Sequence, residues 1–212
     1  TLYRFNQKGG SYLAFLGRIA PEKRPDRAIE IAKRAGIPLK IAAKVDPADQ
    51  KYFEHVIEPL LDDPLVEFIG EISDHEKNEF LGNALALLFP IDWPEPFGLV
   101  MIEAMATGTP VIAWRQGSVP KVIDEGVTGF VVDSIEGAVR AVEQIGGLDR
   151  SAVRQQFEAR FTASQMASKY LAVYKELVAG SKRGRLIKSV PVASSMPTVD
   201  DHPLQPLPVS GL

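Results

Sequence analysis

The sequence PIDWPEPFGLVMIEAMATGTPVIA, from Pro90 to Ala113, predicts a loop, a helix and a strand in direct succession. It passes from a proline-rich loop through Phe-Gly into an apolar segment of helical period that begins near Leu99, and then through Thr-Gly-Thr-Pro into a short apolar run. Such a succession is typical of α/β folds. Glu95 and Glu103 lie on either side of the expected helix start. They are either a functional pair or two unrelated surface charges.

Outward from this stretch, short apolar runs alternate along the chain with longer segments of helical period. Several runs are apolar throughout, as parallel strands covered on both faces are. The expected strands are Tyr12–Gly17, Leu39–Ala43, Leu65–Gly70, Ala84–Pro90, Pro110–Trp114 and Gly129–Val132. We therefore predict a doubly wound α/β domain, with a mostly parallel sheet and helices on both faces.

Apolar stripes of helical period lie between the strands and after them. The stripes contain Ala28, Ile29, Ala32 and Ala35; Tyr52, Phe53, Val56, Ile57 and Leu60; Ile135, Val139, Val142 and Ile145; and Met166, Tyr170, Val173, Tyr174 and Leu177. No strand is expected from Ser134 to Ala179, so the C-terminal end of this domain, residues 1–179, is predicted to be all helical. Residues 180–212 are crowded with proline and serine, which predicts an extended tail or linker.

The composition, with 45% hydrophobic and 24% charged residues, is that of an ordinary soluble globular protein. A net charge of −3 gives no reason to expect nucleic acid as a partner. No apolar run approaches the ~20 residues that span a bilayer, and no signal peptide opens the chain. The absence of cysteine excludes disulfides, thiolate metal sites and cysteine catalysis, and suits the cytoplasm. Because the first residue is Thr1 rather than Met, we expect a fragment of a longer protein.

The loop GRIAPEKRP, which follows the first expected strand, is a candidate anion site. Ligands of open parallel sheets bind beyond the carboxyl ends of the strands, where loops lead into helix N-termini. Gly17 permits close approach of the backbone, and Arg18 and Lys23 add two cations near a helix start. This combination suits a diphosphate. The alternative is that the basic residues of this loop are solvated surface charges.

The segment EFIGEI, from Glu67 to Ile72, ends the third expected strand. Gly70 could let backbone groups approach the edge of a planar base. The alternative is a glycine that only turns the chain.

The acidic pair brackets the third candidate loop. Prolines on both sides of Glu95 stiffen its backbone, and Gly98 allows a ligand close to the start of the following helix. At ~1.5 Å rise per residue, Glu103 lies only one to two turns inside that helix. A phosphate at the helix N-terminus would therefore have one acid on each side. Each carboxylate can accept two hydroxyl hydrogen bonds, which matches the vicinal diols of a sugar and a ribose.

The segments GRIAPEKRPDRAIEIAKRAG, EPFGLVMIEAMATGTPVIA and GSVPKVIDEGVTGFVV, in this order, resemble the C-terminal domain of GT-B glycosyltransferases. Specifically, they resemble the retaining, nucleotide-sugar-dependent enzymes of glycosyltransferase family 4. The resemblance runs from Tyr12 to Tyr174, and Glu95 and Glu103 match the E-x7-E motif of that family. It implies a Rossmann-like domain that forms one half of a GT-B fold. It also implies a hexosyl-type transferase that uses a donor such as a UDP- or GDP-sugar.

The resemblance implies a role for each matching residue. Arg18 and Lys23 would neutralise the donor diphosphate and the charge that develops on the leaving nucleotide. Glu95 would bind the hydroxyls of the donor sugar, as a donor-binding residue rather than a nucleophile. Together these three residues form the expected catalytic set.

The remaining expected contacts hold the nucleotide. The backbone at Phe97, Gly98 and Leu99 would cradle the phosphates, and Glu103 would hold the ribose. No Asp-x-Asp occurs in the chain, which agrees with the metal-independent chemistry expected of this fold. We therefore expect neither a metal site nor a cofactor.

The sequence departs from the family pattern at two positions. Lys121 stands where the family usually has an acid, and Arg24 follows Lys23 where glycine is more frequent. The first departure is expected to have a local, structural effect, and the second to change the conformation of the loop.

A GT-B enzyme has two such domains, and the acceptor binds mainly to the N-terminal one. We expect this chain to be the donor half, without its N-terminal domain and without its still unknown acceptor. Its expected location is the cytoplasm and, through the missing domain, the inner face of the membrane. The histidines His55, His75 and His202 lie outside the candidate loops and are expected at the surface.

Two other classes of function stay open. The same residues would suit a non-catalytic module that binds a nucleotide or a sugar phosphate, or an interaction domain in which the motif is a relic. A dinucleotide-dependent dehydrogenase and a phosphate-loop nucleotidase are disfavoured, because neither G-x-G-x-x-G after the first strand nor G-x-x-x-x-G-K-[ST] occurs.

Overall fold

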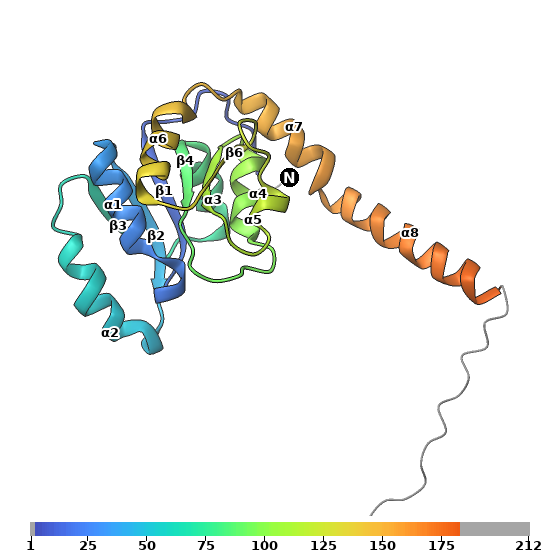
Figure 1. Cartoon of the computed structure of the whole chain (residues 1–212), viewed down its shortest axis with the longest axis horizontal. Helices are drawn as coiled ribbons and strands as arrows, with labels where there is room; N and C mark the ends of the chain where they lie inside the picture. The colour runs from blue at the N-terminus through green and yellow to red at the C-terminus, as the bar shows by residue number, and fades with distance from the viewer. Residues whose placement is uncertain (1–2, 183–212) are drawn as a thin grey trace, which may run out of the picture. The chain divides into compact units, whose positions relative to one another are not determined.

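The computed structural model describes residues 3–182 and contains a six-stranded parallel sheet (Figure 1). Its strands are β1 (Tyr12–Ile19), β2 (Leu39–Val45), β3 (Val66–Gly70), β4 (Ala84–Phe89), β5 (Val111–Trp114) and β6 (Gly129–Val132). The predicted doubly wound α/β fold is confirmed. The first two strands extend two residues beyond their predicted ends, and the other ends lie within one residue of the prediction.

The strand order is β3-β2-β1-β4-β5-β6. The chain therefore builds the sheet outward from β1 in one direction, and then returns to the other side of β1 with β4. This reversal makes the carboxyl ends of β1 and β4 the topological switch point, where open α/β sheets bind their ligands. The loops that carry Lys23 and Glu95 begin at these two strand ends.

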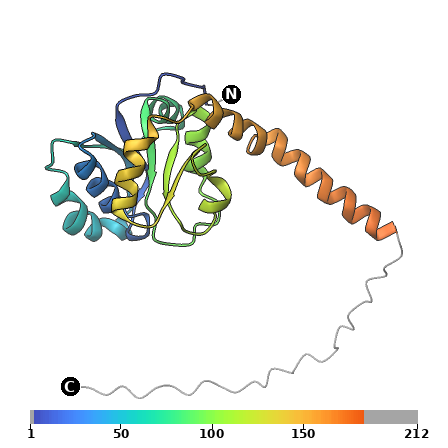
Figure 2. The same cartoon turned by 45° about the horizontal axis from the view of Figure 1, so that its top comes forward.

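Helices cover both faces of the sheet (Figure 2). On one side α1 (Pro25–Ala35) packs beside α6 (Ile135–Ile145), and on the other α3 (Asp74–Gly82) and α7 (Arg150–Arg160) pack beside α4 (Leu99–Thr107). A short α5 (Val119–Val122) follows β5. The strands between these layers are mostly apolar, and each large aliphatic side chain buried there contributes about 1.5–3 kcal/mol. Fully buried members of this core are Leu13, Ile19, Leu39, Ile41, Leu87 and Leu88.

The stripe predicted from Tyr52 to Leu60 does not form one regular helix. The chain there runs through η2 (Pro47–Asp49), α2 (Gln50–Tyr52), the π-helical η3 (Phe53–Ile57) and η4 (Glu58–Leu60). Of the predicted stripe only Ile57 is fully buried, and Val56 is 40% exposed. Pro59 lacks the N–H that a continuing α-helix would need, which accounts for the break before it.

A half-buried arginine ties the first turn of α7 to the sheet. Arg150 donates hydrogen bonds to the carbonyl oxygens of Asn6, Gly82 and Ala84 and to the hydroxyl of Thr109. Burial lowers the pKa of its guanidinium to about 10. Because these acceptors come from four separate segments, Arg150 joins the N-terminal segment and α7 to the edge of the sheet opposite the candidate loops.

The chain divides into two compact units, of which the first ends at Lys169 and the second begins at Tyr170. The last helix, α8 (Ala163–Lys182), extends from one into the other. Its predicted apolar stripe is present on a helix, but each member is more than half exposed: Met166, Tyr170, Val173, Tyr174 and Leu177. The predicted tail, 180–212, lies almost entirely outside the described residues, and the domain limit at residue 179 stays a prediction. Among the described helices, none combines the length and the apolar character that crossing a membrane would require.

Candidate functional site

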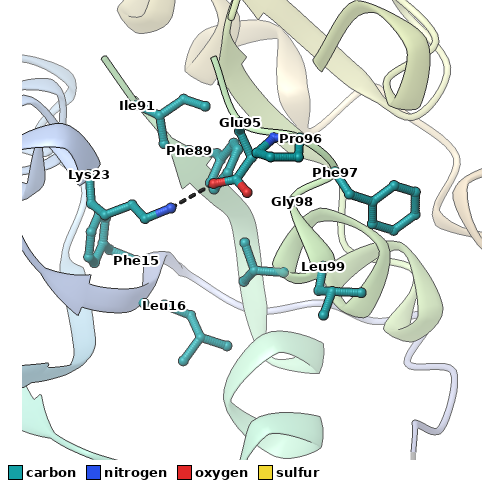
Figure 3. Close-up of a pocket in the computed structure, with 12 residues that line it drawn as sticks. Phe15, Leu16, Lys23, Phe89, Ile91, Glu95, Pro96, Phe97, Gly98 and Leu99 are labelled. Atoms are coloured by element: carbon teal, nitrogen blue, oxygen red, sulfur yellow. Dashed lines mark hydrogen bonds and ion pairs between the residues drawn. The ribbon is translucent and has the colours of Figure 1, made fainter. Parts of the chain in front are cut away.

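The loops after β1 and β4 enclose a cavity of about 410 Å³ at the switch point of the sheet (Figure 3). This volume lies within the range of small-molecule sites. Its wall combines apolar side chains with one cation, one carboxylate and the first turn of α4. The lining residues are Phe15, Leu16, Gly17, Lys23, Phe89, Ile91, Glu95, Pro96, Phe97, Gly98, Leu99 and Val100.

Lys23 and Glu95 form an ion pair inside this cavity (Figure 3). The distance from Lys23 Nζ to Glu95 Oε2 is 2.6 Å, and the Trp93 indole N–H donates to the same oxygen at 3.1 Å. The Lys23 ammonium also lies 5.0 Å from the centre of the Trp93 ring. Both charged side chains are mostly buried, with 22% and 15% of their surface exposed. The site therefore holds a cation and an anion that a polar ligand could engage separately.

The N-terminus of α4 opens into the same cavity through Gly98. This glycine has φ +77° and ψ +67°, and a Cβ added there would lie 2.6 Å from Met101 Cε. Gly98 therefore has a left-handed backbone conformation, which glycine adopts most easily. The first turn of α4 contains no acidic side chain. Its free N–H groups and the positive end of the helix dipole are suited to an anion.

A second cavity, of about 430 Å³, adjoins the first and shares Leu16, Gly17, Leu99 and Val100 with it. Glu103 lines this second cavity, with one carboxylate oxygen 3.9 Å from Lys77 Nζ. The pKa of the neighbouring Tyr3 is raised, mainly by burial and then by the charge of Glu103. The two acids of the E-x7-E pattern thus lie in different but adjoining cavities.

Two of the residues selected from the sequence line neither cavity. Arg18 is 47% exposed and pairs with Glu22 at 2.7 Å and with Asp49 at 3.5 Å. Gly70 ends β3 with φ +85°. The structure therefore brings together Gly17, Lys23, Glu95, Phe97, Gly98 and Leu99 in the first cavity, with Glu103 in the second. It does not bring Arg18 or Gly70 into their walls.

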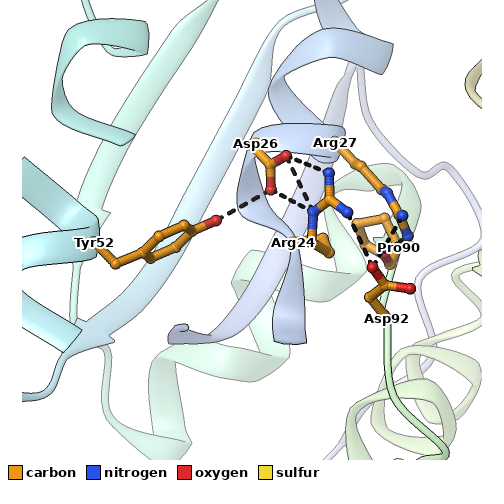
Figure 4. Close-up of polar contacts among 6 residues, drawn as sticks. All are labelled: Arg24, Asp26, Arg27, Tyr52, Pro90 and Asp92. Atoms are coloured by element: carbon orange, nitrogen blue, oxygen red, sulfur yellow. Dashed lines mark hydrogen bonds and ion pairs between the residues drawn. The ribbon is translucent and has the colours of Figure 1, made fainter. Parts of the chain in front are cut away.

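A network of charges fixes the loop after β4 to the start of α1 (Figure 4). Arg24 donates twice to the carboxylate of Asp26, and its other nitrogen lies 3.1 Å from Asp92 Oδ2. Arg27 also reaches Asp92, at 3.2 Å, and the Tyr52 hydroxyl donates to Asp26 at 3.1 Å. Burial disfavours ionisation of Asp26, but the hydrogen bonds and charge of Arg24 outweigh it, so the pKa of Asp26 is lowered.

The network also explains why arginine stands at position 24. Among the described non-glycine residues, Arg24 alone has a positive φ, with φ +53° and ψ +51°. This left-handed conformation is the one that glycine adopts freely, and it costs other residues roughly 1–2 kcal/mol. The ion pairs with Asp26 and Asp92 offset that cost. The sequence did not reveal this network because Tyr52 and Asp92 lie far along the chain from Arg24, Asp26 and Arg27.

The loop after β5 supports the Glu95 backbone, a role that the sequence did not reveal. Ser118 N–H donates to Glu95 O at 2.9 Å, and the Ser118 hydroxyl donates to Phe97 O at 2.9 Å. Gly117, with φ +52°, lies so close that a Cβ there would be 2.3 Å from Glu95 O.

Nearby, Lys121 is an exposed residue of α5. His55 and His75 are exposed as predicted, and His202 lies outside the described residues.

The sheet is Rossmann-like, and its candidate site lies at the switch point, beside a helix capped by glycine. This arrangement is typical of nucleotide-binding domains, a class that includes the halves of GT-B glycosyltransferases. The model of the family Glycosyl transferases group 1 matches residues 4–158, and the chain belongs to this family.

Two relatives show the extent of the similarity. The chain is 28% identical over 207 residues to D-inositol 3-phosphate glycosyltransferase of Mycobacterium marinum, covering 87% of this chain and 42% of the relative. It is 30% identical over 125 residues to phosphatidyl-myo-inositol mannosyltransferase of Mycobacterium leprae, covering 55% of this chain and 33% of the relative. The chain thus spans less than half the length of these curated relatives.

Solved structures show the same fold. HepE of Anabaena, in complex with UDP and glucose, superposes with a TM-score of 0.69 at 19% identity, covering 79% of this chain and 49% of that protein. AviGT4, a glycosyltransferase involved in avilamycin A biosynthesis, gives a TM-score of 0.70 at 25% identity, covering 84% of this chain and 55% of that protein.

Proposed function

We propose that this chain is the donor-binding part of a retaining glycosyltransferase of family 4. The enzyme would move a hexosyl group from a nucleotide sugar, such as a UDP- or GDP-sugar, to an acceptor. One observation carries the proposal: Lys23, Glu95 and the N-terminus of α4 share a cavity, and Glu103 lines the cavity that adjoins it. A ligand that extends through both cavities would meet a phosphate site flanked by two hydroxyl acceptors.

The diphosphate would lie at the glycine-capped start of α4, against the backbone of Phe97, Gly98 and Leu99. Lys23 lines the same cavity and would offset the charge that develops as the bond from the sugar to the phosphate breaks. Arg18 would assist only after leaving Glu22, its partner at 2.7 Å. That movement is within the reach of an arginine side chain that is 47% exposed.

The two carboxylates would divide the remaining contacts. Glu95 would accept hydrogen bonds from the donor sugar, and Glu103 from the ribose, because a carboxylate can accept from two vicinal hydroxyls. Gly17 lines both cavities, and Gly70, at the end of β3, would let the backbone approach the edge of the base. In this proposal the cations and the helix N-terminus supply the charge stabilisation that a metal ion supplies elsewhere, so no metal is required.

The acceptor would bind to a further domain, since the chain spans less than half the length of the relatives named above. Transfer with retention of configuration and a cytoplasmic location also belong to the proposal. HepE, whose structure holds UDP and glucose, supports a nucleotide-sugar donor through its shared fold.

Isothermal titration calorimetry on the 212-residue chain tests the proposal. UDP, GDP and ADP, together with UDP-glucose and GDP-mannose, would be titrated in turn. We expect saturable one-to-one binding of at least one nucleotide and of the corresponding nucleotide sugar. Absence of binding for all five would contradict donor binding, and would favour an interaction domain in which the motif is a relic.

A further inference from the structure

We propose that the ion pair between Lys23 and Glu95 is a specificity device that selects nucleotide sugars against bare nucleotides. The inference rests on the proposed function, and it assigns to the pair a role that neither residue has alone. The two groups neutralise each other as an ion pair. A nucleotide sugar replaces both partners, whereas a nucleoside diphosphate replaces only one.

The geometry of the pair makes the competition unavoidable. Lys23 Nζ and the Trp93 indole N–H both donate to Glu95 Oε2, at 2.6 and 3.1 Å. Gly98 and Leu99 at the start of α4 line the same cavity as Lys23 and Glu95, so an anion bound there would compete with this carboxylate for Lys23. When the phosphate takes Lys23, Glu95 loses its counter-charge in a site where only 15% of its side chain is exposed. A partly buried carboxylate that loses its partner is costly.

Glu95 cannot escape this position by a movement of its backbone. Its N–H donates to Trp93 O at 2.8 Å, and its carbonyl accepts from Ser118 N–H at 2.9 Å. Gly117 packs against the same peptide so closely that no side chain would fit there. The charge network of Arg24 and Asp92 fixes the preceding part of the loop to α1. The backbone of Glu95 therefore stays beside the site of the incoming anion.

A sugar attached to the diphosphate offsets the cost that Glu95 bears when it loses Lys23. Its hydroxyl groups can donate to Glu95 and replace the hydrogen bond lost from Lys23. A free diphosphate brings no such donors and one more negative charge, which the adjacent carboxylate repels. The competition between the phosphate and Glu95 for Lys23 would also favour departure of the nucleotide once the sugar has been transferred, because the ion pair can then form again.

A double-mutant cycle tests the inference in the 212-residue chain. The four proteins are wild type, Glu95→Gln, Lys23→Gln and the double variant, each titrated by calorimetry with UDP, GDP, UDP-glucose and GDP-mannose. In Glu95→Gln we expect the bare nucleotide to bind roughly two- to fivefold more tightly, as expected for the loss of a partly exposed ion pair. We expect the nucleotide sugar to bind about tenfold or more weakly, because a charged hydrogen-bond acceptor is lost.

The Lys23→Gln background is the internal control. If Glu95 acts mainly through Lys23, adding Glu95→Gln to Lys23→Gln will raise the affinity for the bare nucleotide clearly less than adding it to wild type, because only the direct repulsion between carboxylate and phosphate is then removed. An equal gain in both backgrounds would mean that Glu95 acts only as a general negative charge, and would overturn the inference. Unchanged or weaker binding of the bare nucleotide to Glu95→Gln would overturn it as well. Circular dichroism melts verify that each variant is folded.

Failure of the inference is distinguishable from failure of the proposed function. If the wild-type chain binds nucleotides and nucleotide sugars but Glu95→Gln does not change their ratio, only the specificity device is wrong. If none of the four proteins binds any of these ligands, donor binding itself is wrong.

Discussion

At the scale of single residues, the site combines side chains whose roles depend on their partners. Glu95 faces a cation 2.6 Å away, whereas Glu103 has its nearest cation, Lys77, at 3.9 Å. Glu103 therefore has the longer ion pair of the two acids, and 23% of its side chain is exposed. This difference supports separate roles for the two acids, with Glu103 as the acceptor for ribose hydroxyls.

Replacing Glu103 by Gln tests the ribose assignment. The change keeps the shape of the side chain but removes the charge that strengthens its hydrogen bonds, which are worth roughly 1.5–3 kcal/mol. We expect calorimetry to show about tenfold or greater loss of affinity for both the bare nucleotide and the nucleotide sugar. Glu30→Gln on α1, an acid that pairs with Arg34 at 2.6 Å and lines neither cavity, is the matched control. Equal affinities in Glu103→Gln and the control would exclude the ribose role.

Asp26 gives the stability of the chain a pH dependence. Its pKa is lowered in the folded state, so it stabilises the fold above its unfolded pKa of about 4, and this stabilisation is lost as the pH falls through the folded value. We expect thermal melts from pH 6 down to pH 3 to show a steeper loss of stability for wild type than for Asp26→Asn. Parallel curves for the two proteins would contradict the ion pair with Arg24.

At the scale of elements, the start of α4 is the part of the site that could be predicted from sequence. Glu95, Gly98 and Glu103 lie close together in the sequence, so the geometry of a helix is enough to place them relative to one another. The pairing of Lys23 with Glu95 could not be predicted from the residues, because the two lie 72 positions apart. The same holds for the network of Arg24 and for the contact of Ser118 with the Glu95 carbonyl, since both depend on how separate loops meet.

Replacing Gly98 by Ala tests the anion site at the start of α4. Its positive φ makes any side chain strained by roughly 1–2 kcal/mol, and the new Cβ would meet Met101 Cε at 2.6 Å. Gly36→Ala, with φ +66° and no atom within 4 Å of the new Cβ, reproduces the backbone strain alone at the end of α1. We expect both variants to melt at lower temperature than wild type, but only Gly98→Ala to lose nucleotide affinity. Retention of full affinity by Gly98→Ala would place the phosphate elsewhere.

At the scale of the whole molecule, the order of the strands determines where the site lies. The alternation of apolar runs was sufficient to predict the parallel sheet, because strands covered on both faces are apolar along their whole length. The strand order itself was not available from those runs, and it is the order that brings the loops after β1 and β4 together. The helical stripe predicted from Tyr52 to Leu60 is wrong as one regular helix, because the periodicity of apolar residues does not reveal a π-helical turn.

The most direct test of the central claim is to follow backbone amide shifts by NMR while UDP and GDP are added in turn to the isotope-labelled chain. We expect one of the two nucleotides to shift the amides of Gly98 and Leu99 most strongly, with smaller shifts at Gly17 and Glu103. Those residues belong to the two adjoining cavities at the carboxyl ends of β1 and β4. Saturable shifts confined to another part of the chain, or no shifts with either nucleotide, would contradict a nucleotide-sugar site at this position.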